Sequence, residues 1–305
     1  MAMIDIAVVG GGPAGLTAAL YAARAGRRVT VFEGNGFGGQ ITLSSLVENY
    51  PGLGNVSGME LGDRMYVQAE QAGATLSFSG VEAIQKTSDD TFLLTTEDGM
   101  AEARAVIYAA GAAPRHLELP GEEALVGRGI SYCALCDGTF FANQDVAVAG
   151  GGNTALEDAL YLSERCRTVT LIHRRDTFRA ESALLERAKN TKNLTMVTQA
   201  QIMELCAQNG SLTGLVLQKQ NGTRESLAVS GLFVAFGRVP DTAPLSGLAA
   251  RDEQGYVLTD DQMQTQTPGL FAAGDCRRKQ VRQLTTAVSD GTVAAISACR
   301  YLGTR

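Results

Sequence analysis

Residues 8–16 read Val-Val-Gly-Gly-Gly-Pro-Ala-Gly-Leu, and residues 148–156 read Val-Ala-Gly-Gly-Gly-Asn-Thr-Ala-Leu. The two stretches align without a gap. Each follows an apolar run that predicts a buried parallel strand, and each leads into a predicted helix. Two strand–turn–helix copies of this kind predict an α/β chain with two Rossmann-like, three-layer dinucleotide-binding domains.

The first copy has the features of a pyrophosphate site. Gly10 permits a tight turn, Gly12 lets the backbone approach a pyrophosphate, and Gly15 lets the helix pack closely on the strand. The free N–H groups at the helix start would face the phosphates. Glu33, which ends the second strand, can accept hydrogen bonds from ribose hydroxyls. The residues predicted to contact a cofactor here are Gly10, Gly12, Pro13, Ala14, Gly15 and Glu33.

The second copy ends differently, because basic residues replace the acid after its second strand. A glutamate would repel a 2′-phosphate at this position, whereas arginine attracts it and binds it with two hydrogen bonds. A solvated basic patch is the alternative interpretation, but the position next to the ribose favours a site for NADPH. The predicted contacts are Gly150, Gly152, Asn153, Thr154, His173, Arg174, Arg175 and Arg179.

One cysteine pair, Cys133 and Cys136, lies between the two copies. A disulfide accepts two electrons to become a dithiol, and a Cys-x-x-Cys at a helix start lowers the thiol pKa below its free value of about 8.5. Half of a zinc site is the alternative, but such a site needs four ligands. The chain has 2 histidines and no second cysteine pair with metal spacing, so we predict no metal.

Composition limits the class of protein. A chain of 305 residues with 45% apolar content suggests about two domains. The net charge of −6 argues against binding to nucleic acid or to an anionic membrane surface. We find no apolar run of the roughly 18 residues that a membrane span needs, and no signal-peptide pattern. We therefore expect a cytoplasmic enzyme, in which a disulfide is more often catalytic than structural.

The motifs are arranged as an insertion of one domain into another. Residues 1–115 hold the first copy, residues 116–242 hold the dithiol and the second copy, and residues 243–305 contain a short strand that ends in Gly274 and Asp275. This last block is too short to be a domain by itself. We therefore expect it to complete the first domain, with linkers near residues 112–115 and 239–241.

The sequence resembles the low-molecular-weight, bacterial-type thioredoxin reductases, a class of pyridine nucleotide-disulfide oxidoreductases. The resemblance runs from end to end. It is carried by residues 10–15, 38–42, 47–52, 133–138, 150–155 and 173–180, and by the Gly-Asp and Arg-Gln pairs at 274–275 and 282–283.

This resemblance implies that the outer domain binds FAD and the inserted one NADPH. The further FAD residues that it implies are Gly39, Gln40, Asn49, Val81, Gly274, Asp275, Arg282 and Gln283. It also implies that Cys136 lies against the flavin and that Cys133 attacks a substrate disulfide. Asp137 is then the candidate general acid, with a turn-capping role as the alternative.

The implied partner is thioredoxin or a thioredoxin-like small protein, and the implied assembly is a homodimer. Four alternatives use the same residues. The first three are a reductase for a peroxiredoxin or glutaredoxin-like partner, a disulfide-forming oxidase, and a ferredoxin-fed reductase, which the arginine set disfavours. The fourth is a redox sensor that holds FAD and NADPH without turnover.

Overall fold

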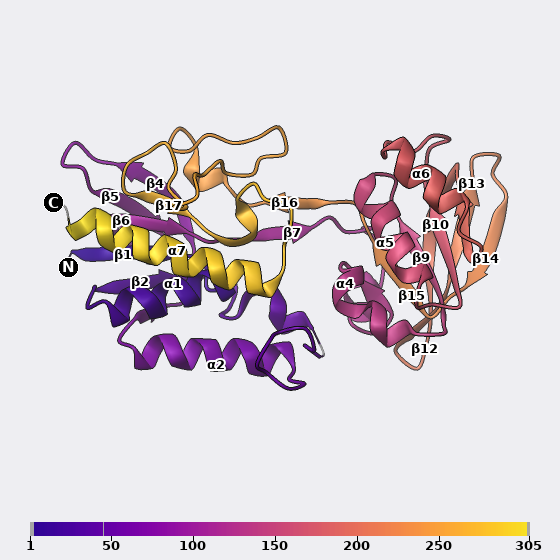
Figure 1. Cartoon of the computed structure of the whole chain (residues 1–305), viewed down its shortest axis with the longest axis horizontal. Coiled ribbons are helices and arrows are strands. Elements are labelled where there is room, and N and C mark those ends of the chain that lie inside the picture. Colours follow the sequence, from indigo (N-terminus) through magenta and orange to yellow (C-terminus); the bar gives the residue numbers. More distant parts are fainter. Residues whose placement is uncertain (1–2, 45, 304–305) are drawn as a thin grey trace. The chain divides into compact units, whose positions relative to one another are not determined.

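The computed structural model describes residues 3–44 and 46–303. The chain forms two compact units, one made of residues 1–113 and 239–305 and the other of residues 114–238 (Figure 1). Each unit combines a sheet that contains parallel strands with helices, which confirms the predicted α/β class. Among the described residues, no helix has the length and apolar character needed to cross a bilayer.

The first unit is built on a seven-stranded mixed sheet with the order β3-β2-β1-β6-β5-β4, in which β17 also pairs with β6. Strands β1, β2, β3, β6 and β17 are parallel, while β4 and β5 are antiparallel. The strands are β1 (Ile4–Val9), β2 (Val29–Phe32), β3 (Thr75–Ser77), β4 (Val81–Lys86), β5 (Phe92–Thr96), β6 (Gly99–Tyr108) and β17 (Leu270–Ala272). The helices are α1 (Pro13–Arg24), α2 (Gly58–Gln71) and α7 (Leu284–Gly303), with the 3-10 turns η1 (Gly39–Leu43), η3 (Ala243–Leu245) and η4 (Gly274–Cys276).

Helices α1 and α7 lie side by side, because small residues let their backbones approach (Figure 1). A Cβ atom on Gly291 would lie 2.2 Å from the Ala14 carbonyl oxygen, so only glycine fits at this crossing. The two helices enclose a core with the apolar β1 side chains Ile6 and Val8. This packing brings residues near the C-terminus to the start of α1, where the first glycine-rich turn lies.

The second unit has a five-stranded parallel sheet of order β11-β10-β9-β15-β8 and a three-stranded antiparallel sheet of order β12-β13-β14. The strands are β8 (Ile130–Ser131), β9 (Asp145–Ala149), β10 (Thr168–Ile172), β11 (Leu194–Val197), β12 (Ala200–Gln208), β13 (Ser211–Lys219), β14 (Arg224–Ala228) and β15 (Gly231–Val234). The helices are α3 (Glu122–Leu125), α4 (Ala134–Asp137), α5 (Asn153–Ser163) and α6 (Ser182–Lys189), with the 3-10 turn η2 (Gly138–Phe141). Leu156, Ala159 and Leu162 of α5 are fully buried against the parallel sheet.

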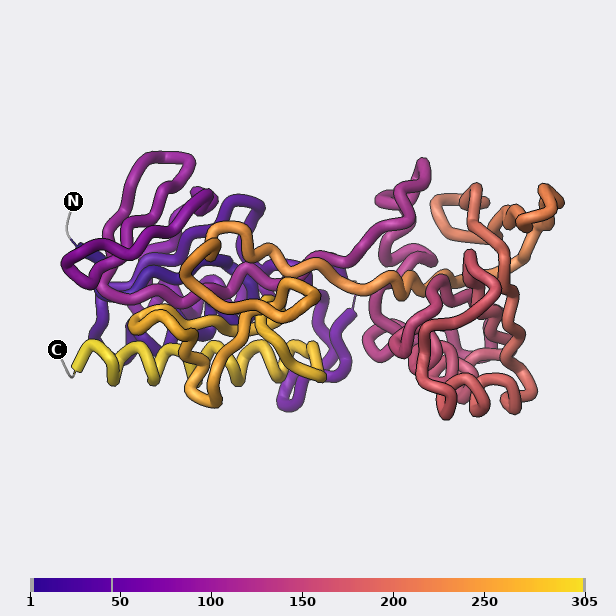
Figure 2. The backbone as a smooth tube through the Cα atoms, turned by 90° about the horizontal axis from the view of Figure 1, so that it is seen from above, coloured from indigo at the N-terminus to yellow at the C-terminus, as the bar shows by residue number. Residues whose placement is uncertain are grey.

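The two expected linkers are paired strands rather than irregular segments. Strands β7 (Ala112–Pro114) and β16 (Arg238–Pro240) form a two-stranded sheet, and the two passages of chain lie side by side in Figure 2. The boundaries lie at 113/114 and 238/239 instead of the expected 115/116 and 242/243. The second boundary lies earlier because residues 239–242 bond to the first unit: the Tyr108 hydroxyl donates to the Asp241 carbonyl oxygen at 2.9 Å, and the Thr242 hydroxyl donates to the Gly255 carbonyl oxygen at 3.0 Å.

Candidate active site and cofactor sites

The reactive cysteines lie at the start of a one-turn helix in the second unit. Cys133 is the N-cap of α4, and its Sγ accepts a hydrogen bond from the Cys136 backbone N–H at 3.2 Å. The two cysteines form a disulfide with their Cα atoms 5.3 Å apart. Leu135, between them, is 54% exposed, so the disulfide lies next to a surface that another molecule can reach.

Asp137 is held in the same turn by a serine that the sequence analysis did not single out. The Ser131 hydroxyl donates to Asp137 Oδ2 at 2.6 Å and accepts a hydrogen bond from the Cys133 backbone N–H at 3.1 Å. Burial raises the pKa of Asp137, and the Ser131 hydrogen bond opposes this rise. In the described structure Asp137 makes no side-chain capping bond to η2, although a turn-capping role was the alternative. Burial therefore favours the neutral form of a carboxyl that follows Cys136 directly in the sequence.

The first glycine-rich turn leaves the start of α1 open. Gly12 is the N-cap of α1, and no side chain caps the free N–H groups there. The Gly12 and Gly39 backbones are so close that a Cβ on Gly39 would lie 2.9 Å from Gly12 Cα. Glu33 lies beside the turn and accepts the Gly11 N–H at 2.7 Å and the Asn35 N–H at 2.7 Å. This open, glycine-lined helix start suits a pyrophosphate.

The other residues predicted for the first cofactor form several small contacts within the first unit. Asn49 Nδ2 donates to Gln283 Oε1 at 3.3 Å, and Gln40 Nε2 donates to the Ala112 carbonyl oxygen at 2.7 Å. Val81 lies in β4, next to the buried cluster under that strand.

Asp275 shows the strongest sign of a missing polar partner. Its Oδ1 atom is buried and makes no hydrogen bond to any described residue. The Arg282 guanidinium donates to the Asp275 carbonyl oxygen at 3.4 Å and stacks over the Tyr256 ring at 4.0 Å. Gly274 lies against the start of α1, since a Cβ there would be 2.8 Å from the Ala14 Cβ. A buried carboxylate oxygen beside an open helix start suits a ligand with both hydroxyl and phosphate groups, which FAD provides.

The second glycine-rich turn repeats this geometry with a different residue after the strand. Gly152 is the N-cap of α5 without a side-chain cap, and the space next to its Cα is open. His173 packs on Gly151, where a Cβ would lie 2.1 Å from the imidazole. In the first unit, Glu33 packs on Gly11 in the same way. The aligned residues of the two copies therefore occupy equivalent positions.

His173 supports the basic loop from inside. It is only 7% exposed, its Nε2 lies 3.1 Å from the Thr177 carbonyl oxygen, and its ring stacks on Phe178. Burial lowers the pKa of His173, as do the nearby arginines, and the hydrogen bond to the Thr177 carbonyl opposes this shift. The Arg179 N–H donates to the Gly151 carbonyl oxygen at 2.8 Å, which ties the loop to the glycine-rich turn.

The charged side chains of this loop face solvent. Arg174, Arg175 and Arg179 are all exposed, and Thr154 is exposed at the helix start. Asn153 exchanges hydrogen bonds with Glu181, using its Nδ2 at 3.0 Å and its Oδ1 at 2.9 Å.

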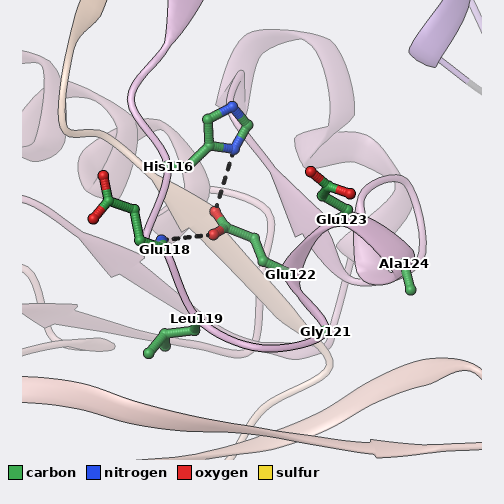
Figure 3. Close-up of a pocket in the computed structure, with 7 residues that line it drawn as sticks. All are labelled: His116, Glu118, Leu119, Gly121, Glu122, Glu123 and Ala124. Carbon is green, nitrogen blue, oxygen red and sulfur yellow. Dashed lines mark hydrogen bonds and ion pairs between the residues drawn. The ribbon is translucent and has the colours of Figure 1, made fainter.

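His116, to which the sequence analysis assigned no role, faces the Glu122 carboxylate with its Nδ1 3.6 Å from Glu122 Oε1 (Figure 3). Its Nδ1 lies 2.7 Å from the Tyr132 hydroxyl, which donates to Glu122 Oε1 at 2.7 Å. The buried Glu122 also accepts the backbone N–H groups of Leu117 and Glu118 at 2.8 and 2.9 Å. This network anchors Tyr132, which directly precedes Cys133. Because the network consists of side-chain contacts, the sequence alone does not indicate it.

The remaining cysteines are separate from the disulfide. Cys166 and Cys276 are buried, as expected for core thiols, and burial raises the pKa of Cys276 to about 12. Cys206 and Cys299 are only partly buried. Within residues 3–44 and 46–303, no group of three or more His, Cys, Asp or Glu side chains has the arrangement of a metal site.

Comparisons with known proteins agree with this geometry. Residues 4–291 match the model of the family described as pyridine nucleotide-disulphide oxidoreductase. A bifunctional thioredoxin reductase/thioredoxin of Mycobacterium leprae is 45% identical over 303 residues, which are 98% of this chain and 66% of that protein. A thioredoxin reductase of Mycolicibacterium smegmatis is 44% identical over 98% of this chain and 96% of its own length. The crystal structure of a thioredoxin reductase from Streptococcus pyogenes superposes with a TM-score of 0.95 at 39% identity, covering 100% of this chain and 99% of that one.

Proposed function

The chain belongs to the pyridine nucleotide-disulphide oxidoreductase family, and on this premise we propose that it is an NADPH-dependent thioredoxin reductase. The observation that carries the proposal is the Cys133–Cys136 disulfide in the same unit as the arginine-bearing glycine-rich turn. Relatives that match over almost the whole chain are named thioredoxin reductases, which supports this activity over the alternatives.

The first unit is the proposed FAD site, and the open start of α1 would receive the pyrophosphate. Glu33 and Asp275 would accept hydrogen bonds from cofactor hydroxyls, with Asn49, Arg282 and Gln283 nearby. FAD supplies two-electron transfer between a nicotinamide and a disulfide. Members of this family use FAD and NADPH, and the buried Asp275 oxygen that makes no hydrogen bond to a described residue supports the same use here.

The second unit is the proposed NADPH site, with the pyrophosphate at the open start of α5. Arg174, Arg175 and Arg179 are exposed on the loop tied to the turn, and we assign the 2′-phosphate to them. His173 is buried and packs on Gly151 and Phe178, so we assign it the role of holding this loop.

The reduced cysteines carry out thiol–disulfide exchange. The Cys133 thiolate attacks one sulfur of the substrate disulfide and forms a mixed disulfide, while the other substrate sulfur leaves as a thiolate. Asp137 provides the proton for that leaving group. Cys136 then attacks the Cys133 sulfur, which restores the Cys133–Cys136 disulfide and releases the second substrate thiol.

The proposed substrate is thioredoxin or a similar small protein. Leu135, between the two cysteines, is 54% exposed and Phe140, in η2, is 37% exposed, and apolar side chains exposed in this way suit a protein partner. The Mycobacterium leprae relative carries thioredoxin in its own name. A homodimeric assembly and a cytoplasmic location complete the proposal on the basis of the family resemblance.

The test is stopped-flow absorbance of the purified, FAD-loaded protein without oxygen. We expect NADPH to bleach the flavin absorbance and oxidised thioredoxin to restore it. Cys133→Ser and Cys136→Ser should each abolish thioredoxin reduction, whereas the matched control Cys206→Ser should retain it, because Cys206 lies in β12 outside the disulfide. A colourless protein that takes up no flavin would overturn the proposal, and reoxidation only by oxygen would favour the oxidase.

A further inference from the structure

Asp275 is backed by a group of buried charges from the C-terminal part of the chain. Asp290 comes from α7, and Arg277 and Lys279 come from the segment between η4 and α7. The side chains of Lys279 and Asp290 are 9% and 8% exposed, and that of Arg277 is 16% exposed. Buried charges are costly unless they are paired, so an extended set of this kind requires an explanation.

Asp290 uses one oxygen atom to fix the start of η4. Its Oδ2 accepts the Gly274 N–H at 3.1 Å, the Arg277 Nε–H at 3.1 Å and the Lys279 ammonium at 2.9 Å. Gly274 directly precedes Asp275, so the α7 carboxylate determines where the Asp275 backbone lies. These three donors satisfy a carboxylate that would otherwise be buried without compensation.

Lys279 connects this anchor to the cofactor carboxylate. Its ammonium donates to Asp290 and to the Thr286 hydroxyl at 3.2 Å, and it lies 3.6 Å from Asp275 Oδ1. That oxygen is the buried one that makes no hydrogen bond to a described residue. One cation therefore lies between two carboxylates, and the Asp275 oxygen that faces it is buried and makes no hydrogen bond to a described residue.

The charge of Lys279 offsets an electrostatic conflict. Gly274 lies against the start of α1, so Asp275 is next to the proposed pyrophosphate site. A carboxylate beside a pyrophosphate is repelled by it, and burial strengthens that repulsion because screening is weak. A cation held beside the carboxylate offsets this repulsion, and the carboxylate can still accept hydrogen bonds.

We propose that Lys279, held by Asp290, is a positioning residue for the FAD site: it orients and neutralises Asp275 so that the carboxylate can accept cofactor hydroxyls beside the pyrophosphate. The proposal rests on the proposed FAD site of the first unit. It concerns affinity for a dinucleotide with hydroxyl and phosphate groups, and gives Lys279 no part in electron transfer.

The test measures FAD affinity, by the quenching of flavin fluorescence, in a double-mutant cycle. Lys279→Met should weaken FAD binding about ten-fold or more, as expected for the loss of an interaction between charged groups. In an Asp275→Asn background the same change should weaken binding less than about two-fold, since the interaction partner is already neutral. Lys86→Met is the matched control, because Lys86 pairs with Asp90 at 3.0 Å in the same unit. This variant should bind FAD as tightly as the native protein does.

Each outcome decides the proposal. Equal FAD affinity in Lys279→Met and the native protein overturns it. An equal loss in both backgrounds also overturns it, because a general structural effect does not depend on the Asp275 charge. If Lys279→Met does not fold, Lys279→Gln, which can still donate to Asp290, takes its place in the same cycle. A native protein that binds no FAD refutes the proposed function itself, and is thereby distinguished from a failure of Lys279 alone.

Discussion

At the scale of single residues, the proposed acid Asp137 and its hydrogen-bond partner Ser131 give a prediction about pH dependence. If protonated Asp137 is the acid, activity is present below its raised pKa and is lost as the pH rises through it. Ser131 lowers that pKa, so Ser131→Ala should move the alkaline fall in activity to higher pH. Asp137→Asn should reduce kcat by about 10²–10⁴-fold, the usual size of general acid catalysis.

The measurement is the pH profile of kcat/KM for thioredoxin reduction in both variants. Ser163→Ala is the matched control, since the Ser163 hydroxyl donates to the Leu160 carbonyl oxygen within α5 and does not contact Asp137. An alkaline limb that stays in place in Ser131→Ala would show that another group sets it.

Asp158 gives a second pH prediction, this time for stability. Burial raises its pKa to about 7, with a smaller contribution from the Glu157 carboxylate. Because the folded pKa is the higher one, Asp158 contributes its full stability to the folded state only below the unfolded pKa of about 3.9. This contribution falls as the pH rises from there and is fully lost once the pH has passed through 7. Asp158→Asn should therefore raise stability more at pH 8.5 than at pH 5, by roughly 3 kcal/mol, because about 2 of the roughly 3 pKa units of the shift lie above pH 5 and each is worth about 1.4 kcal/mol.

Melting temperatures at pH 5 and pH 8.5 check this expectation. Glu157, the exposed neighbour of Asp158, supplies the control. Glu157→Gln removes a carboxylate from the same turn of α5 and leaves Asp158 in place. A gain of equal size at both pH values would mean that the ionisation of Asp158 is not the cause.

At the scale of elements, the two glycine-rich turns differ in how closely the following helix packs on them. A Cβ on Gly15 would lie 1.9 Å from the Gly10 carbonyl oxygen, so α1 requires glycine there. In the second copy the equivalent residue is Ala155, which is fully buried without such a clash. Gly15→Ala should therefore displace α1, cost roughly 1–3 kcal/mol as overpacking does, and lower the FAD content per chain.

Ala155→Gly is the reciprocal control, with an expected cost of about 1 kcal/mol from helix propensity alone. Flavin absorbance per chain and the melting temperature would be measured for both variants. If Gly15→Ala keeps its full FAD content, the turn tolerates a Cβ and the close packing is not required for binding.

The elements show what the sequence could predict. Each glycine-rich turn lies between a parallel strand and a helix, as predicted, because apolar runs and glycines define these elements locally. The β7–β16 pair was missed, since Ala112–Pro114 has no alternating pattern and its pairing depends on a distant segment. Ser131 and Lys279 were missed for a related reason, because their roles come from side-chain contacts made only after folding.

At the scale of the whole molecule, the connection between the units limits how the chemistry can proceed. The dithiol and the proposed NADPH site belong to one unit, while the proposed FAD site belongs to the other. The dithiol and the nicotinamide of NADPH must therefore reach the same flavin one after the other. The connecting strands β7 and β16 are short, and the Arg115 N–H bonds the Gly237 carbonyl oxygen at 3.0 Å beside them. A narrow two-stranded connection can twist without loss of either core.

We therefore expect the inserted unit to rotate during each catalytic cycle. A short amine-reactive cross-linker that ties the two units should leave one half-reaction intact and stop turnover, because the tied protein can present either the nicotinamide or the dithiol, but not both. The half-reactions are followed separately as flavin bleaching by NADPH and flavin reoxidation by thioredoxin, and peptide mapping identifies the ties that join both units. A monofunctional reagent of the same chemistry controls for lysine modification. Full turnover in protein shown to be tied between units would exclude the rotation and require a fixed path for both electron transfers.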